Sequence, residues 1–418
     1  MKTKAVRLYG ENDLRLDEFE LPEIKDDEIL VEIISDSICM SSYKAATQGK
    51  KHKRVPKNID TNPIIIGHEF AGNIVKVGKD HQDKFKPGTK FAQQPALNYK
   101  GSMYSPGYSY EYFGGACTYC IVPKEVMELN CLINYSGKSY YEASLAEPMS
   151  CIIGAYHAMY HTKMGNYTHH MGIVDGGKLA IVAGAGPMGL GAIDYALHAE
   201  PRPSLLVVTD INDDRLIRAE NIFTKDEANK LGVEIFFVNT NKVENPVEYL
   251  RGLTNGTGFD DVLVLAPVND AVAVSDKILG RDGCMNFFAG PSDPEFKGEI
   301  NLYNVHYNST HVMGTTGGNA DDLLESLKMT EEGLINPAVM VTHIGGLDTE
   351  AETTLTLPKI PGGKKLIYTH INLPLIAIDD LEEKGKEDHR FNELSKICRE
   401  NKGLWCIEAE EYLLSNFK

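Results

Sequence analysis

Side chains that bind metals recur through the first part of this chain: Cys39, then His68 and Glu69, then Glu147. One thiolate, one imidazole and one or two carboxylates suit a zinc ion that keeps one position open for substrate. Because these residues are scattered and not spaced as in a compact zinc finger, several loops must converge to form the site. The pattern predicts a catalytic zinc that polarises a substrate oxygen.

Taken alone, two of these residues have a more ordinary interpretation. Cys39 would more often be a small buried apolar side chain, and His68 a hydrogen-bonded core histidine. Glu147 shifts the balance, because it lies in the apolar segment 144–148, where an unpaired carboxylate would be costly. Glu69 directly follows His68, so on a regular strand the two would face opposite ways. We expect Glu69 either to support the ligands or to alternate as one of them.

A glycine-rich run, Gly-Ala-Gly-Pro-Met-Gly, predicts a second site, for a dinucleotide. The motif is weak alone, but here an apolar strand pattern precedes it and a helical pattern follows. Gly184 permits a tight turn, Gly186 lets the backbone approach a pyrophosphate, and Gly189 lets helix and strand pack closely. A helix is predicted from Met188, and its free amide groups would bind the phosphates, with Pro187 and Met188 among the cofactor contacts. A glycine-rich turn without a nucleotide is the alternative.

An acidic residue follows at the position that such a site requires. Asp210 ends the next apolar run, about 20 residues beyond the glycine motif. A carboxylate there accepts hydrogen bonds from the ribose hydroxyls and repels a 2′-phosphate, so it favours NAD(H) over NADP(H). Arg215 works against that preference. The two sites together predict that a hydride passes between a substrate carbon and a nicotinamide.

Two kinds of element must position these residues. Before residue 150 the chain has short β-branched runs punctuated by glycine, which predict an irregular β-rich domain. Beyond it, strands at 180–183, 205–209 and 261–265 alternate with helices such as 213–231, which predicts a parallel doubly wound sheet. The chain has 418 residues, which is long for one core, so we expect two domains.

Composition narrows the class of protein further. The formal net charge of −17 disfavours nucleic acid and anionic membranes as partners. The opening residues lack the apolar core of a signal peptide, and no run approaches the roughly 18 apolar residues of a membrane span. Eight cysteines are too few for a disulfide scaffold in a chain of this length, which favours a reduced, cytoplasmic setting.

Two other clusters resemble metal sites by composition only. Cys117 and Cys120 have a metal-binding spacing, but they lie in a strand-like run, where positions three apart face opposite ways. His157, His161 and the pair at 169–170 have no cysteine or acid at ligand spacing, so we interpret them as helix surface.

These motifs, in this order, resemble the zinc-dependent medium-chain dehydrogenases, the alcohol and polyol dehydrogenases. The resemblance extends over most of the chain through segments 37–41, 67–72, 147–150 and 312–314 and the glycine run. It implies an α/β protein with a β-rich GroES-like catalytic domain and a Rossmann dinucleotide-binding domain. The implied catalytic domain is residues 1–151 and 319–418, and the implied Rossmann domain is residues 152–318.

The resemblance also implies roles for single residues. The zinc ligands would be Cys39, His68 and Glu147, with Glu69 ligating in some members. Ser41 would pass on the substrate proton, with Lys44 where some members have a relay histidine, so the route of the proton beyond Ser41 departs from the family pattern. The resemblance implies four further cofactor contacts: Asp210, Arg215, Ala266 and Thr315. Residues 90–115 lack the family's structural-zinc cysteines, so we expect one zinc per subunit.

The substrate is the least determined part of the prediction. The chain is most similar to the sugar-phosphate reductases of this family, and the basic run 50–57 follows the predicted zinc and proton-transfer residues. A solvated loop is the plain interpretation of that run; recognition of a substrate phosphate by Lys51 and Arg54 is the sharper one. Alternatives are a neutral polyol or threonine-type dehydrogenase, a zinc-free quinone reductase and a non-catalytic NAD-binding protein.

Family resemblance implies a homodimer or homotetramer, and the last 50 or so residues extend beyond the usual family ending.

Overall fold

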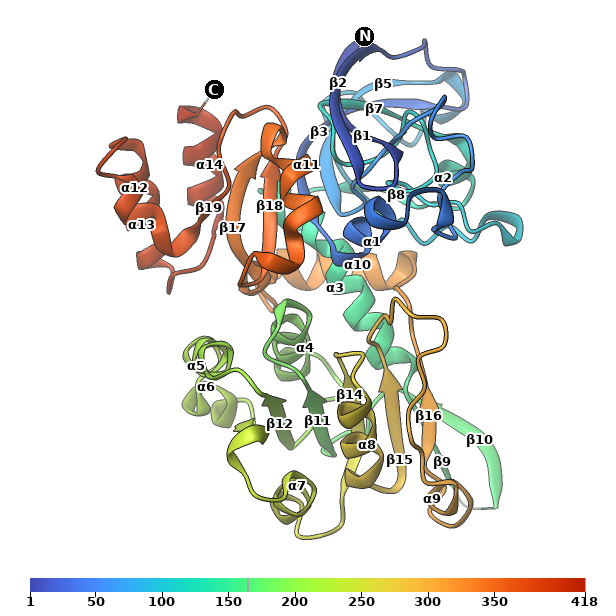
Figure 1. Ribbon diagram of the computed structural model, residues 1–418, viewed down its shortest axis with the longest axis vertical. Helices are drawn as coiled ribbons and strands as arrows, with labels where there is room; N and C mark the ends of the chain where they lie inside the picture. Colours follow the sequence, from blue (N-terminus) through green and yellow to red (C-terminus); the bar gives the residue numbers. More distant parts are fainter. Residues whose placement is uncertain (164, 418) are drawn as a thin grey trace. The chain divides into compact units, whose positions relative to one another are not determined.

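The structure is a computed structural model that describes residues 1–163 and 165–417 (Figure 1). The chain forms two compact units. The first comprises residues 1–147, 323–331 and 341–418, and the second comprises residues 148–322 and 332–340. No described helix is both long enough and apolar enough to cross a membrane.

The first unit is built on an antiparallel and mixed β-structure. Its larger sheet has the strand order β19-β17-β18-β3-β5-β6-β8, with β7 paired to β3, and a smaller sheet has the order β2-β1-β4. The strands are β1 (Lys2–Gly10), β2 (Asp13–Glu20), β3 (Ile29–Ile38), β4 (Ile64–Ile65), β5 (Phe70–Val77), β6 (Lys90–Gln93), β7 (Tyr119–Val122), β8 (Leu132–Tyr135), β17 (Val341–Gly346), β18 (Lys364–Tyr368) and β19 (Ile376–Ala377).

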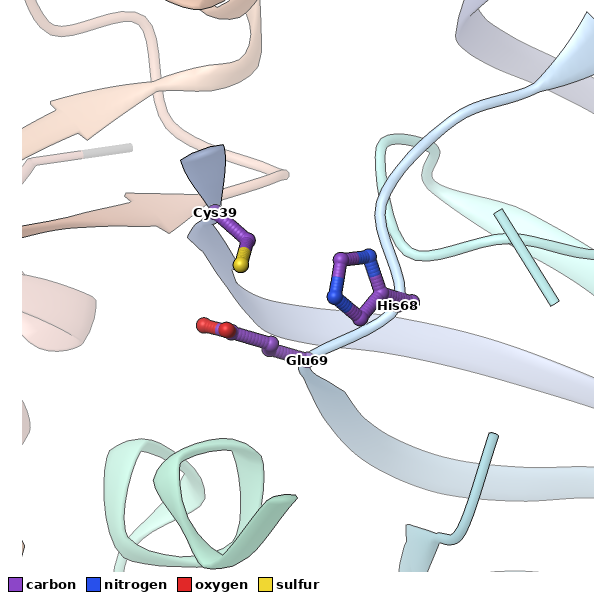
Figure 2. Close-up of side chains that lie close together, drawn as sticks. All are labelled: Cys39, His68 and Glu69. Atoms are coloured by element: carbon purple, nitrogen blue, oxygen red, sulfur yellow. The ribbon is translucent and has the colours of Figure 1, made fainter. Parts of the chain in front are cut away.

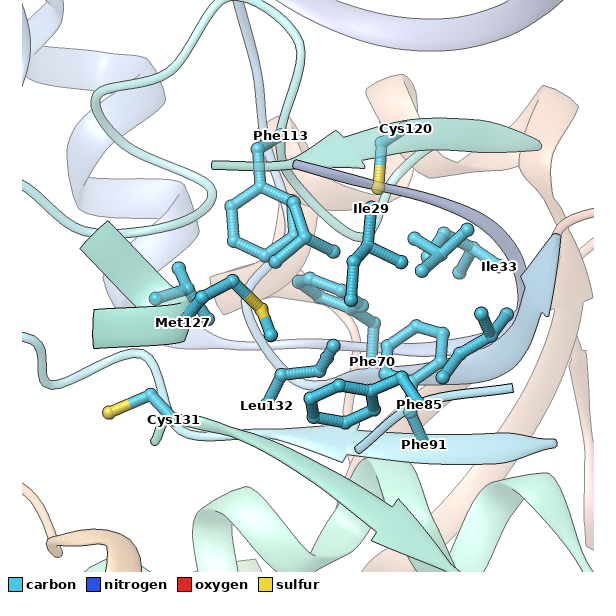
Figure 3. Packing of buried hydrophobic residues seen from close by; sticks show 14 of the residues in the cluster. Ile29, Ile33, Phe70, Phe85, Phe91, Phe113, Cys120, Met127, Cys131 and Leu132 are labelled. Atoms are coloured by element: carbon cyan, nitrogen blue, oxygen red, sulfur yellow. The ribbon is translucent and has the colours of Figure 1, made fainter. Parts of the chain in front are cut away.

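The long strand β3 is the centre of this unit because β-branched residues make up most of its first half. Ile29, Val31 and Ile33 alternate along it and are buried in one cluster with Phe70 and Phe91. Figure 3 shows Ile29 and Ile33 packed with these two phenylalanines. The same strand ends at the residues that begin the metal site. The core of the β-structure therefore fixes the position of that site.

Helices complete the first unit. They are α1 (Met40–Gln48), α2 (Lys124–Glu128), α10 (Ala320–Glu331), α11 (Leu347–Thr356), α12 (Leu381–Lys384), α13 (Arg390–Glu400) and α14 (Ile407–Asn416). Helix α3 (Tyr140–Ala158) begins in this unit and ends in the other, since the boundary falls between Glu147 and Pro148. The first three residues of α10, 320–322, likewise belong to the second unit.

The second unit contains a six-stranded parallel sheet in the order β13-β12-β11-β14-β15-β16. Numbered along the chain, this is the 3-2-1-4-5-6 order of a dinucleotide-binding fold. Its elements are β9 (Tyr160–Lys163), β10 (Asn166–Met171), β11 (Lys178–Val182), α4 (Pro187–His198), β12 (Leu205–Asp210), α5 (Asp213–Ile222), α6 (Lys225–Lys230), β13 (Glu234–Asn239), α7 (Pro246–Leu253), β14 (Phe259–Val264), α8 (Asn269–Ile278), β15 (Leu279–Phe287), α9 (Leu302–Tyr307) and β16 (His311–Met313).

Two local predictions need correction. The single helix predicted over 213–231 is two helices, because Thr224 caps α6 by accepting a hydrogen bond from the amide of Glu227. The histidine-rich stretch is not helix surface beyond His157: residues 160–163 and 166–171 pair as the antiparallel hairpin β9–β10. Every residue of β10 is exposed, so no buried apolar face marks these polar strands in the sequence.

Candidate metal centre and active site

Cys39, His68 and Glu69 lie together in the first unit (Figure 2). One ligand atom from each, the Cys39 sulfur, a His68 ring nitrogen and a Glu69 carboxylate oxygen, all lie within 4.8 Å of one another. His68 is 5% exposed, Glu69 is 1% exposed and Cys39 is half-buried. Among the described residues this is the one group of three or more such side chains close enough to share an ion.

The ends of buried elements hold these side chains in place. Cys39 is the residue between β3 and α1, so it lies at a helix N-terminus, where the dipole favours a thiolate. Burial and the charge of Glu69 act against this and raise the pKa of the thiol, so a bound cation would be needed to hold it as a thiolate. His68 and Glu69 immediately precede β5. Gly67 has a φ of +86°, and a Cβ there would come within 2.6 Å of the amide nitrogen of Ala116. Only glycine therefore allows the turn that presents the two ligands.

Glu69 is held by a buried ion pair that the sequence motifs did not reveal. The ammonium group of Lys364, on β18, donates to both carboxylate oxygens of Glu69 at 2.5 Å, and Ser37 donates to one of them. Burial opposes ionisation of both groups, but the attraction between them lowers the pKa of Glu69 and raises that of Lys364. Glu69 and Lys364 are therefore a charged pair beside the candidate metal ligands.

Glu147, on α3, lies next to this cluster, though it is not one of the three grouped side chains. Burial raises the pKa of its carboxyl to about 7, with His68 opposing that shift and Glu69 adding to it. A Cys39 thiolate, Glu69 and Glu147 carry three formal negative charges, and Lys364 carries one positive charge. The remaining two negative charges in a buried site fit a divalent cation, so the residues present suit zinc.

Ser41 also lies next to this cluster, on the first turn of α1. Its hydroxyl donates to the Cys39 sulfur at 3.0 Å and lies 3.3 Å from Nε2 of His68. The hydroxyl of Tyr108 donates to Ser41 Oγ at 2.7 Å and is 3.4 Å from the same His68 nitrogen. Lys44 is half-buried on the same helix, and burial lowers its pKa. Ser41 thus has a buried phenol as its hydrogen-bond donor.

Tyr108 was not identified from sequence, although a signal was present. It follows Gly107, whose φ is +73° and whose Cβ would come within 2.2 Å of the carbonyl oxygen of Gly67. The glycine therefore lets the Tyr108 loop approach the backbone next to His68. The contact between Gly107 and Gly67 could not be predicted from a single sequence, because nothing in the spacing of the glycines shows which loops touch.

The basic run 50–57 divides into residues with different surroundings. Lys50 pairs with Asp60, and Lys51, which is 77% exposed, pairs with Glu11. Arg54 instead lies with its guanidinium carbon 5.3 Å from the centre of the Tyr108 ring. Burial lowers the pKa of His68 and the charge of Arg54 adds to that shift, whereas burial raises the pKa of Tyr108 and Arg54 opposes it. Arg54 is therefore the member of the run that faces the candidate site.

His52 completes this positive side of the site. Its ring stacks on the Tyr108 ring at 5.6 Å with an interplanar angle of 11°. Burial and then the charges of Arg54, Lys53 and Lys44 lower its pKa to about 4. The neutral imidazole and the flanking cations make a region that would attract an anion.

In the second unit the glycine run forms the turn between β11 and α4. Gly186 caps the helix, and Pro187 occupies its first turn. A Cβ at Gly189 would come within 1.9 Å of the carbonyl oxygen of Gly184, so close helix–strand packing requires glycine there. A Cβ at Gly186 would meet nothing within 4 Å, which leaves open space in front of the helix N-terminus.

Three of the remaining candidate cofactor residues lie at or just after the carboxyl ends of the parallel strands, where ligands bind in such folds. Asp210 ends β12; one oxygen accepts from the Ala185 amide and the other from the amides of Ile211 and Asn212. Arg215 is exposed on α5. Two other candidates follow neighbouring strands: Ala266 comes after β14, and Thr315, which contacts Asn286, comes after β16.

The rejected cysteine pair forms part of the hydrophobic core. Cys117 and Cys120 are fully buried in the β3 cluster, and burial raises the pKa of the Cys117 thiol well above its usual value. His161 instead bonds to Asp261 and Asp282, so it ties the β9–β10 hairpin to the sheet. Among the described residues neither set forms a group of three potential metal ligands.

Comparison with known proteins identifies the family. A model of the zinc-binding dehydrogenases matches residues 187–332, and a model of the alcohol dehydrogenase GroES-like domain matches residues 25–130. The chain is 52% identical to mannitol-1-phosphate 5-dehydrogenase of Aliivibrio fischeri over 413 residues, which span 99% of this chain and 97% of the relative. This chain belongs to the zinc-binding dehydrogenase family. It is also 44% identical to L-sorbose 1-phosphate reductase of Klebsiella pneumoniae over 414 residues, spanning 99% of this chain and 98% of the relative.

Solved structures of more distant members show the same fold. The 2R,3R-butanediol dehydrogenase from Bacillus subtilis matches with a TM-score of 0.71 at 22% identity, covering 88% of this chain and all of the other. L-idonate 5-dehydrogenase from Escherichia coli matches with a TM-score of 0.67 at 16% identity, covering 88% and 98%. The predicted GroES-like and Rossmann architecture is confirmed, as is the prediction of a zinc-dependent alcohol or polyol dehydrogenase.

Proposed function

We propose that this protein interconverts a ketose phosphate and an alditol phosphate, with hydride exchanged with NAD(H) and one catalytic zinc. The observation that carries the substrate class is the position of Arg54, whose charge lies over Tyr108 on one side of the metal-ligand cluster. The two relatives named for sugar phosphates span nearly the whole chain, which supports the same class. We expect NAD(H) to be preferred over NADP(H), because a carboxylate at the end of β12 would accept from the ribose hydroxyls and repel a 2′-phosphate.

The metal ligands in this proposal are Cys39, His68 and Glu147. Glu69 supports them, since Lys364 and Ser37 already donate to its oxygens. When bound, zinc supplies Lewis-acid polarisation, and the nicotinamide supplies or accepts the hydride. Ser41 Oγ lies 3.0 Å from the Cys39 sulfur and 3.3 Å from Nε2 of His68, so a substrate oxygen bound beside these two ligands would reach it.

Ser41 carries the proton in this scheme. In the structure its hydroxyl donates to the Cys39 sulfur, and it accepts from Tyr108. A substrate hydroxyl arriving at this side would donate to Ser41 Oγ, and Tyr108 would stabilise the serine oxygen as the proton moves. Arg54 would hold the phosphate on the outer side of Tyr108, so the ring separates the charged phosphate from the reacting carbon.

The assay that tests this function compares a ketose with its 1-phosphate as oxidants of NADH, using zinc-loaded protein. One or two charge-assisted hydrogen bonds to the phosphate contribute about 1.5–3 kcal/mol each, so kcat/KM should favour the phosphate by on the order of 100-fold. Equal or better turnover of the neutral ketose would overturn the proposal and place the protein with the neutral polyol dehydrogenases. Turnover of L-threonine alone would place it in the amino-alcohol branch.

A further inference from the structure

The last helix, α14, reaches the start of helix α3, the helix that carries Glu147. Glu410, on α14, accepts hydrogen bonds from two backbone amides at the first residues of α3. The Tyr140 amide donates to Oε2 at 2.6 Å, and the Tyr141 amide donates to Oε1 at 2.8 Å. The first turn of any α-helix leaves its amide groups without partners inside the helix. Glu410 supplies that capping interaction from 270 positions away in the sequence.

Glu410 is itself held rigidly. The Tyr368 hydroxyl donates to its Oε1 at 2.9 Å, and the indole nitrogen of Trp405 donates to the Tyr368 oxygen at 2.8 Å. Trp405 and Tyr368 are fully buried, and Glu410 is 2% exposed. A buried carboxylate with several charge-assisted hydrogen bonds fixes the groups around it far better than an exposed cap does.

The anchored end of α3 is close to Glu147 along the helix. Glu147 comes seven positions after Tyr140, which is about two turns or about 10 Å along the helix. Pro148 follows Glu147 inside the same helix and has no amide to donate to the turn before it. The first two turns are therefore less firmly joined to the rest of α3, and their position depends more on what holds their N-terminal end.

A second connection leads from the same cluster to the site. Tyr368 is the last residue of β18, and Lys364, the partner of Glu69, is the first. The strand is buried along its whole length. Glu410 thus bonds to both elements, α3 and β18, that deliver a charged side chain to the metal-ligand cluster.

We propose that Glu410 is a positioning residue for the metal site, and that the C-terminal helices serve to hold Glu147 in its ligating place. The inference rests on the assignment of Glu147 as a zinc ligand in the proposed function. It does not depend on which substrate the enzyme uses. It gives a role to the part of the chain that extends beyond the usual family ending.

The test compares Glu410→Gln with Glu411→Gln, a matched change at the neighbouring exposed position. An amide presents an N–H toward one of the two α3 amides, so E410Q loses at least one cap bond. We expect E410Q to release zinc to a chelator on the order of tenfold faster than wild type, the equivalent of about 1.4 kcal/mol in the barrier to release. The visible absorption bands of its cobalt-substituted form should also shift, whereas E411Q should match wild type in both. Wild-type release and spectrum in E410Q would overturn the proposal.

The variant Glu147→Gln distinguishes positioning from general loosening. If Glu410 acts through Glu147, adding E410Q to E147Q should change zinc release no further, whereas additive effects would contradict the proposal. If E410Q fails to fold, Tyr368→Phe removes one donor to Glu410 and should speed release roughly threefold, about half the effect in free energy; wild-type release in Y368F would also overturn it. Zinc release and the cobalt spectrum are both measured without substrate, so they test this proposal even if the sugar-phosphate assay fails.

Discussion

At the scale of single residues, Asp36 and Glu350 are a buried carboxyl pair apart from the metal ligands. Asp36 is fully buried, and among the described residues neither of its carboxylate oxygens has a hydrogen-bond partner. One carboxylate oxygen of Glu350 also lacks a partner there. Burial raises the pKa of Glu350 to about 8. The pKa of Asp36 lies well above its usual value, mainly because the group is buried and then because of the negative charges of Glu350 and Glu69. A proton held between the two groups would supply the missing donor.

This pair predicts a pH dependence of stability. Glu350 has a pKa near 4.5 when unfolded and about 8 when folded, so between these values only the folded state holds the proton. The free energy of unfolding should therefore fall as pH rises through this window, by up to about 1.4 kcal/mol per pH unit from this one group. Urea unfolding of zinc-saturated protein across the window should show a shallower slope for Glu350→Gln than for wild type.

The control for that measurement is Glu352→Gln, on the exposed side of the same helix α11. It should leave the slope as in wild type. The other ionisable groups near the pair, Glu69 and Cys117, are unchanged in both variants. An E350Q slope equal to that of wild type would show that Glu350 does not carry its proton into the folded state.

At the scale of elements, the sequence predicted the strands and the glycine motif well because each has a local cause. The 3-2-1-4-5-6 sheet follows from buried strands alternating with helices, and Gly189 is required by the backbone of Gly184. The hairpin β9–β10 was missed because its polar strands carry no apolar alternation to mark a buried face. The Lys364–Glu69 pair was also missed, since 295 positions separate the two residues.

The glycine turn gives a prediction that separates folding from cofactor binding. Gly189→Ala places a Cβ against the carbonyl of Gly184, so the free energy of unfolding should fall by about 1–3 kcal/mol. Gly186→Ala meets no protein atom, so its stability should be unchanged, but NADH affinity should fall roughly tenfold, about 1.4 kcal/mol. Fluorescence titration with NADH and thermal unfolding measure the two effects.

Gly252→Ala is the matched control for that pair, because it too meets nothing within 4 Å but lies on α7, away from the glycine turn along the chain. It should bind NADH as wild type does. Undiminished NADH affinity in G186A would show that the open space before α4 is not where the pyrophosphate lies.

At the scale of the whole molecule, the dominant feature is charge. The chain carries a formal net charge of −17, so a phosphorylated substrate is repelled at long range and needs local attraction to bind. The basic run is evident in the sequence, but the sequence does not show which of its residues face the site. That distinction depends on the ion pairs of Lys51 with Glu11 and of Lys50 with Asp60, which are visible only in the folded protein. That pairing leaves Arg54, and not Lys51, to face the candidate active site.

The measurement that tests the central claim most directly is the KM for a ketose 1-phosphate and for the neutral ketose in Arg54→Gln and Lys51→Gln. Each variant removes one positive charge from the same run, so their effects on net charge are identical. We predict that R54Q raises the KM for the phosphate on the order of tenfold or more, about 1.4 kcal/mol, and leaves that for the neutral ketose within about twofold. K51Q should change neither by more than about twofold. Equal effects of the two variants, or an equal effect of R54Q on both substrates, would contradict the account.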